Sequence, residues 1–133
     1  MTAPSILIID DEQNQRIVLE QTFQVLQHNW YITTVETGQH ALEFLSQHTP
    51  NLIITDYHMP AMDGLELITH IRHQGITTTI ILITAYSSPM LDEAAQNLHI
   101  HHYLTKPVSL STLRDIVITI MNNAHNHRID TSA

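Results

Sequence analysis

The chain has no cysteine among its 133 residues. It therefore forms no disulfide, offers no thiolate to a metal ion and has no cysteine nucleophile, which is compatible with a reducing compartment. Lysine and arginine are also scarce, with five of them against thirteen acidic residues and a formal charge of -8. Because contacts to phosphates need clustered cations, this balance disfavours nucleic acid as a direct partner.

Long hydrophobic runs are absent as well. No stretch of about eighteen apolar residues is present to form a membrane span, so we expect no membrane partner. The first residues, MTAPSILIIDDE, lack the basic start and cleavage site of a signal peptide. We therefore expect a cytoplasmic protein, and the length suits one domain with one core.

What the sequence does contain is a regular alternation of short apolar runs and amphipathic segments. An uninterrupted run such as 52–54 is typical of a strand that is buried on both faces. Apolar residues at helical spacing, such as Leu110, Leu113 and Val117, predict the intervening helices. The expected strands are 6–9, 30–35, 52–54, 80–83 and 101–104, and the expected helices are 13–27, 37–49, 65–73, 88–98 and 109–122.

Strands that are separated by helical crossovers imply a parallel sheet with right-handed connections. We predict an α/β fold: a single doubly wound (βα)5 flavodoxin-like domain, with a five-stranded parallel sheet of order 2-1-3-4-5 and helices on both faces. We assign residues 1–123 to this domain. Residues 124–133 are polar and have no apolar stripe, so we expect a disordered tail or the start of a linker.

Acidic residues follow two of the expected strands. Asp10 and Asp11 come directly after the first strand, and Asp56 ends the third. In the predicted order these strands are neighbours, so the three carboxylates should meet at the carboxyl edge, where ligands bind in open α/β sheets. The structural alternative is that Asp10 and Asp11 only cap the following helix.

Thr84 and Lys106, the only lysine, end the fourth and fifth strands and should flank the acids. Three close carboxylates repel one another unless a cation compensates them. Mg²⁺ suits such oxygen ligands and leaves positions for phosphate. We therefore predict phosphoryl transfer, with Asp56 as the nucleophile that forms an acyl phosphate. Lys106 and the Thr84 hydroxyl would stabilise the phosphoryl oxygens.

Five short motifs, in this order, resemble the receiver domain of two-component response regulators. They are DD at 10–11, D followed by MP at 56–60, MDG at 62–64, TA at 84–85, and YLTKP at 103–107. The resemblance covers about residues 5–121. It implies a phosphorelay protein that takes a phosphoryl group from a sensor histidine kinase or a phosphotransfer protein and then controls a downstream target protein or an effector domain. Such a domain phosphorylates and dephosphorylates itself and is not a turnover enzyme.

The resemblance also implies how the site holds its metal. Asp11, Asp56 and the backbone carbonyl of His58 would bind Mg²⁺ directly, and Asp10 would hold a water on the metal. The Lys106–Pro107 peptide bond would be cis, a rare choice that aims the lysine.

Two further pairs of residues receive roles from the resemblance. Thr84 and Tyr103 would form a switch that reshapes the face made by the fourth helix, the fifth strand and the fifth helix. Similar receivers often dimerise through this face, so a homodimer is among the expected partners. His58 and Tyr86 border the phosphoryl position, and we expect their rings to slow hydrolysis of the acyl phosphate.

One departure from the family pattern is the cluster of His99, His101 and His102, where many receivers carry Gly-Ala and acidic residues. These histidines could bind a transition metal or respond to mild acid. Alternation along a strand would point His101 and His102 to opposite faces, which disfavours a shared metal.

Two other functions compete with the receiver interpretation. A Mg²⁺-dependent phosphatase with an aspartyl nucleophile usually has a second acid two residues after that nucleophile, where this chain has His58. A binding-only pseudo-receiver would have a damaged site, whereas every expected residue is present.

Overall fold

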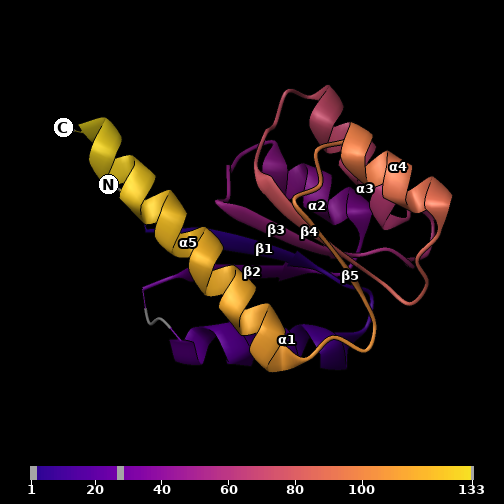
Figure 1. Cartoon of the computed structure of the whole chain (residues 1–133), viewed down its shortest axis with the longest axis horizontal. Coiled ribbons are helices and arrows are strands. Elements are labelled where there is room, and N and C mark those ends of the chain that lie inside the picture. Colours follow the sequence, from indigo (N-terminus) through magenta and orange to yellow (C-terminus); the bar gives the residue numbers. More distant parts are fainter. Residues whose placement is uncertain (1–2, 27–28, 133) are drawn as a thin grey trace.

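Strands and helices alternate along the chain, from β1 to α5 (Figure 1). The computed structural model describes residues 3–26 and 29–132. The strands are β1 (Ser5–Ile9), β2 (Tyr31–Val35), β3 (Leu52–Asp56), β4 (Thr79–Thr84) and β5 (His102–Thr105). The helices are α1 (Gln13–Leu26), α2 (Gly38–Leu45), α3 (Gly64–His73), α4 (Pro89–Asn97) and α5 (Leu110–Ser132).

The sheet has the order β2-β1-β3-β4-β5, and every neighbouring pair is parallel. This confirms the predicted flavodoxin-like α/β fold. The register aligns Ile9 of β1 with Thr55 of β3, and Thr84 of β4 with Thr105 of β5. Residues that follow these positions therefore emerge together at the carboxyl edge of the sheet.

The core lies on both faces of the sheet because successive side chains of a strand point to opposite sides. Ile6 and Ile8 of β1 join one buried cluster with residues of α1 and α5. Leu7 and Ile9 join the other with residues of α2 and α3. Figure 1 shows the same division, with α1 and α5 on one side of the sheet and α2, α3 and α4 on the other. The three central strands β1, β3 and β4 are thus buried on both faces, as their uninterrupted apolar runs predict, whereas the edge strands β2 and β5 are only partly buried.

Polar side chains begin three of the helices. The side chains of Thr37, Asp63 and Ser88 accept hydrogen bonds from backbone N–H groups in the first turns of α2, α3 and α4. Such caps satisfy N–H groups that have no partner within the helix. Pro89 occupies the first turn of α4, which confirms the predicted start of that helix at Ser88-Pro89.

Most boundaries differ from the sequence expectation by one or two residues, and α2 ends at Leu45, four residues before the predicted end. β5 begins at His102 and includes Thr105, one residue later than predicted at each end. α5 continues to Ser132, so the predicted end near Asn122 is wrong, and the backbone of 124–132 is helical where we expected a disordered tail. No proline or glycine follows Pro107, so nothing in the sequence forces the helix to stop. Gln27, the last residue of the predicted first helix, and Ala133 lie outside the described residues.

Among the described residues, no helix combines the length and the apolar character needed to cross a membrane.

Candidate functional site

The three predicted acids meet at the carboxyl edge of the sheet. Asp10, Asp11 and Asp56 each offer a carboxylate oxygen, and these oxygens lie within 4.8 Å of one another. Asp10 and Asp56 are only 6% and 7% exposed, whereas Asp11 is exposed to solvent. The site therefore has two carboxylates set into the fold and one at its surface.

Lys106 brings the only lysine ammonium of the chain to this cluster. Its Nζ lies 3.2 Å from Oδ1 of Asp56. The lysine is positioned by its own backbone, since its N–H donates a 2.7 Å hydrogen bond to the carbonyl of Thr84 at the end of β4. The Lys106–Pro107 peptide bond is cis. Ends of β1, β3, β4 and β5 thus contribute to one site.

Asp10 is the acid whose ionisation the fold opposes most clearly. Its pKa is raised from 3.8 to about 6, mainly by burial and also by the negative charges of Asp56 and Asp11. The N–H of Glu12, which donates a 3.0 Å hydrogen bond to Oδ1 of Asp10, and the ammonium of Lys106 act in the opposite direction. One ammonium does not balance three carboxylates, so the site favours an additional cation.

The donor set suits a hard divalent cation because every side-chain donor is a carboxylate oxygen. Oδ1 of Asp56 is buried and accepts no hydrogen bond from any described residue, although Lys106 is near it. The ammonium of Lys106, 3.2 Å away, compensates this oxygen only in part, because the same ammonium faces three carboxylates. A bound cation would compensate this oxygen.

The loop after β3 lies beside Asp11, at the part of the site where the acids could hold a cation. Exposed His58 and Pro60 line a surface hollow of about 350 Å³ together with Asp11 and Asp63. The loop is fixed by Gly64, whose N–H donates a 2.8 Å hydrogen bond to the carbonyl of Tyr57. A Cβ at Gly64 would clash with the carbonyl oxygen of Asp56. The sequence shows the MDG motif here, but the reason for its glycine is a backbone contact that is visible only in the fold.

Thr84 is fully buried, and Tyr103 is half-buried with its hydroxyl inside the fold. The hydroxyl of fully buried Thr84 donates to the carbonyl of Tyr86 at 3.1 Å and accepts from the N–H of Tyr86 at 3.2 Å. The Tyr103 hydroxyl is buried and makes no hydrogen bond to the described residues, although the backbone of Ser88 is near it. Burial raises the pKa of Tyr103. Tyr86 itself is 77% exposed.

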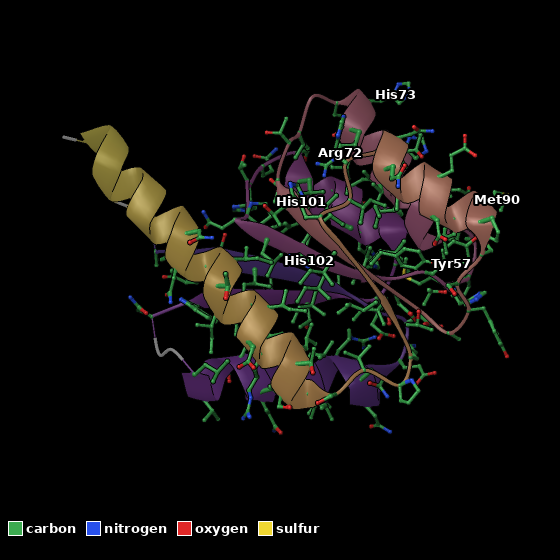
Figure 2. The ribbon with its side chains drawn as sticks, in the orientation of Figure 1. Tyr57, Arg72, His73, Met90, His101 and His102 are labelled. Atoms are coloured by element: carbon green, nitrogen blue, oxygen red, sulfur yellow. The ribbon has the colours of Figure 1, made fainter. Side chains whose placement is uncertain are left out.

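The histidine cluster lies at the other end of the sheet, where β5 begins. Figure 2 shows His101 near Arg72, while Tyr57 lies toward the opposite end of the strands. Partial burial lowers the pKa of His101, and the positive groups of Arg72, His102 and His99 add to that effect. Within the described residues, the only group of three or more potential metal ligands is the acid cluster. The structure therefore does not bring these histidines together as a ligand set.

A model of the response regulator receiver domain family matches residues 6–118. The chain belongs to this family. The match runs from β1 into the first part of α5, and so includes all four strand ends that form the site. The predicted family and fold of this receiver domain are thus confirmed.

Relatives of different length share the receiver domain. Regulator of RpoS from Escherichia coli K12 is 36% identical over 126 residues, which are 91% of this chain but 37% of that protein. Sporulation initiation phosphotransferase F from Bacillus subtilis is 26% identical over 117 residues, covering 88% of this chain and 93% of that protein. The chain therefore spans a little over one third of the first relative and almost all of the second.

Solved structures agree with the architecture. Response regulator TrrA from Thermotoga maritima, in complex with Mg²⁺-BeF, is 32% identical with a TM-score of 0.75, covering 88% of this chain and 98% of that one. The Francisella response regulator 1452 receiver domain is 26% identical with a TM-score of 0.82, covering 91% and 98%. Both relatives are receiver proteins, and both match nearly the whole domain.

Proposed function

We propose that this receiver domain accepts a phosphoryl group on Asp56 from the phosphohistidine of a sensor histidine kinase or a phosphotransfer protein. The observation that carries the proposal is the setting of the Asp56 carboxylate, within 4.8 Å of two other acids and 3.2 Å from Nζ of Lys106. In the transfer, an oxygen of Asp56 forms a bond to phosphorus as the bond from phosphorus to the imidazole nitrogen breaks. The bonding electron pair stays on the imidazole, and Asp56 becomes an acyl phosphate.

Mg²⁺ is the cofactor that fits the acids best. Asp11, Asp56 and the backbone carbonyl of His58 would hold the ion directly, and Asp10 would hold it through a water. The all-oxygen donor set and the Mg²⁺-BeF complex of the relative TrrA support this choice. When bound, Mg²⁺ would neutralise negative charge on the transferring group.

Lys106 and Thr84 would stabilise the phosphoryl oxygens from the ends of β5 and β4. The Lys106 ammonium already neighbours Asp56 and can pair with a phosphoryl oxygen. The Thr84 hydroxyl must leave its hydrogen bonds with the Tyr86 backbone before it can donate to that group. This exchange of partners couples phosphorylation to the loop between β4 and α4.

This coupling would change the surface that a downstream partner recognises. Tyr103 has a buried hydroxyl without a hydrogen bond among the described residues, so a rearranged loop can offer it a new partner. Thr84 and Tyr103 would then act together as a switch for the face formed by α4, β5 and α5. A downstream protein, an attached effector domain or a second copy of the receiver would bind this altered face.

A turnover phosphatase is the weaker alternative. Its chemistry calls for a general acid two residues after the nucleophile, and His58 occupies this place with an exposed side chain. A signalling receiver instead keeps its phosphoryl group long enough to be recognised. We therefore favour one phosphoryl group per chain as the functional product.

The test is incubation with Mg²⁺ and acetyl phosphate, followed by intact mass and peptide mapping. We expect the mass of one phosphoryl group, located on Asp56, and no modification of Asp56→Asn. Asp115→Asn, which changes an exposed acid of α5, should be modified like the wild type. A phosphoryl group that persists in Asp56→Asn, or many phosphates released per chain before any stable modification, would contradict the proposal.

A further inference from the structure

Arg16 lies beside the acid cluster but takes no part in the proposed phosphoryl chemistry. It is the fourth residue of α1, and its backbone N–H donates a 3.1 Å hydrogen bond to the carbonyl of Glu12. A cation near the beginning of a helix faces the positive end of the helix dipole, so α1 itself gains nothing from this charge. The side chain is nevertheless only 16% exposed, which indicates that contacts outside α1 hold it in place.

The contact that holds Arg16 is with the backbone between two of the acids. Nη1 of Arg16 donates a 2.7 Å hydrogen bond to the carbonyl oxygen of Asp10. This carbonyl and the N–H of Asp11 belong to one planar peptide group. A hydrogen bond that fixes the carbonyl therefore also fixes the direction in which the chain leaves Asp10 and enters Asp11.

The sheet explains why the Asp10 carbonyl needs a side-chain donor. The N–H of Asp10 donates a 3.2 Å hydrogen bond to the carbonyl of Val35, the last residue of β2. In a parallel ladder the carbonyl of Asp10 would next accept a hydrogen bond from residue 37 of the same strand. β2 has ended by then, and Thr37 caps α2 instead. A partly buried carbonyl without a partner is unfavourable, and Arg16 supplies the donor.

Arg16 reaches the acid cluster through this backbone contact and not through an ion pair. Among the described residues, the one carboxylate within 4.0 Å of its guanidinium is that of Glu36, directly after β2. That contact is 4.0 Å long and Glu36 is exposed, so it contributes little. The short hydrogen bond to the Asp10 carbonyl is therefore the interaction by which Arg16 affects the site.

We propose that Arg16 is a positioning residue for the metal ligands, because it holds the peptide that joins Asp10 to Asp11 and so fixes the direction of both carboxylates. This inference rests on the proposed Mg²⁺ site and adds to it a residue that touches neither the ion nor the phosphoryl group. Removal of a group that holds metal ligands in place typically lowers metal affinity by about 10–100-fold. The N–H of Asp10 remains bound to β2 without Arg16, so we expect a loss at the lower end of this range.

The sign of the effect distinguishes positioning from charge. Removal of a positive charge near three carboxylates would, by Coulomb attraction alone, strengthen the binding of Mg²⁺. Loss of the hydrogen bond to the Asp10 carbonyl would instead weaken it, because the acids would no longer be held in their binding arrangement. A lower affinity in a variant without the arginine therefore cannot come from the lost charge.

The test is a titration of the unphosphorylated protein with Mg²⁺, followed by the amide resonances of residues 10, 11 and 56. Arg16→Met keeps much of the aliphatic length but has no donor, and its dissociation constant for Mg²⁺ should rise about tenfold. Arg16→Lys restores a donor and should recover most of the affinity. Arg114→Met makes the same change at an exposed arginine of α5 and should bind Mg²⁺ like the wild type. Circular dichroism will verify that each variant is folded.

Two further measurements separate positioning from general damage to the fold. In metal-free protein, the carbonyl carbon resonance of Asp10 and the amide resonance of Asp11 should move in Arg16→Met and return toward the wild-type values in Arg16→Lys. With acetyl phosphate as the donor, Arg16→Met should need about tenfold more Mg²⁺ for half-maximal modification. The rate at saturating Mg²⁺ should stay nearly unchanged, because the arginine acts on binding of the ion and not on the transfer itself.

The outcomes also separate this inference from the proposed metal site. Unchanged or tighter Mg²⁺ binding by Arg16→Met, or equal weakening in Arg114→Met, would overturn the inference and leave the metal site intact. Binding by Arg16→Lys that is as weak as that of Arg16→Met would overturn it as well, since a donor would then make no difference. Failure of the wild type to bind Mg²⁺, or binding that survives in Asp11→Asn, would overturn the proposed metal site and this inference together.

Discussion

At the scale of single residues, Asp10 links the electrostatics of the site to stability. Burial raises the pKa of this carboxyl from 3.8 to about 6. The folded protein therefore holds the proton more tightly than the unfolded chain, and stability falls as pH rises from about 4 to 6. We expect Asp10→Asn to raise the free energy of unfolding of metal-free protein at pH 7, on the order of 2–3 kcal/mol. Urea unfolding at pH 7 and pH 4 measures this gain.

The pH dependence distinguishes this charge effect from a change in packing. At pH 4 the wild-type carboxyl is largely protonated in the folded state, so the gain from Asp10→Asn should nearly disappear. Asp115→Asn removes an exposed acid and should change stability little at either pH. A gain of equal size at both pH values would show that the buried charge is not its source.

His58 and Tyr86 address a different property, the lifetime of the acyl phosphate. Both side chains are exposed, and the His58 ring stands edge-on to the ring of Tyr57 with centroids 4.8 Å apart. We expect the double variant His58→Ala and Tyr86→Ala to release phosphate a few times faster, because water reaches phosphorus more easily without the rings. A time course of phosphate release after removal of acetyl phosphate measures this rate.

His70→Ala provides the matched control, since His70 is exposed on α3. It should leave the release rate unchanged. Slower or unchanged release from the double variant would mean that these rings do not shield the phosphoryl group.

At the scale of elements, Arg72 ties the end of α3 to two connections that are distant in sequence. Its guanidinium donates hydrogen bonds to the carbonyls of Leu98 at 2.8 Å and His99 at 3.1 Å, after α4, and of Ile76 and Thr78, both at 2.9 Å, before β4. Lysine has one compact ammonium and cannot reach all four carbonyls. We expect Arg72→Lys to lower the free energy of unfolding by about 1–3 kcal/mol.

The measurement for Arg72→Lys is urea unfolding together with amide hydrogen exchange. Exchange should accelerate most in residues 98–100, because the hydrogen bonds from Arg72 hold this connection locally. His73→Lys introduces the same side chain at the neighbouring, exposed position and should have little effect. Equal loss of stability in the two variants would show that the hydrogen bonds of Arg72 contribute nothing to the free energy of unfolding.

The hydrogen bonds of Arg72 also show a limit of prediction from sequence. Strands and helix starts are local features, and the run at 52–54 or the Ser88-Pro89 pair identifies them without knowledge of neighbours. Arg72, in contrast, acts on carbonyls that belong to segments beyond its own helix. The need for glycine at position 64 likewise depends on how closely its backbone approaches the carbonyl of Asp56 in the folded loop. Where no local signal exists, as at the end of α5, the predicted boundary was wrong.

At the scale of the whole molecule, the topology explains why the site itself was predictable. Alternating strands and helices limit a chain of this kind to a few parallel arrangements, and each of them collects strand ends at one edge. Asp10, Asp56 and Lys106 could therefore be brought together from their places after strands. The packing of α1 against α5 could not be predicted in the same way, because it depends on how Leu19 and Leu113 fit into one buried cluster.

This topology also predicts that Mg²⁺ stabilises the entire domain. Only the folded chain places Asp56 beside Asp10 and Asp11, so the ion should bind the folded state in preference to the unfolded one. At a Mg²⁺ concentration 100 times its dissociation constant, the gain in unfolding free energy should be about 2.7 kcal/mol. Urea unfolding with and without MgCl₂, at ionic strength matched with NaCl, separates binding from general screening. Asp11→Asn should lose most of this increment and Asp115→Asn should keep it, whereas an equal increment in both variants would place the ion elsewhere.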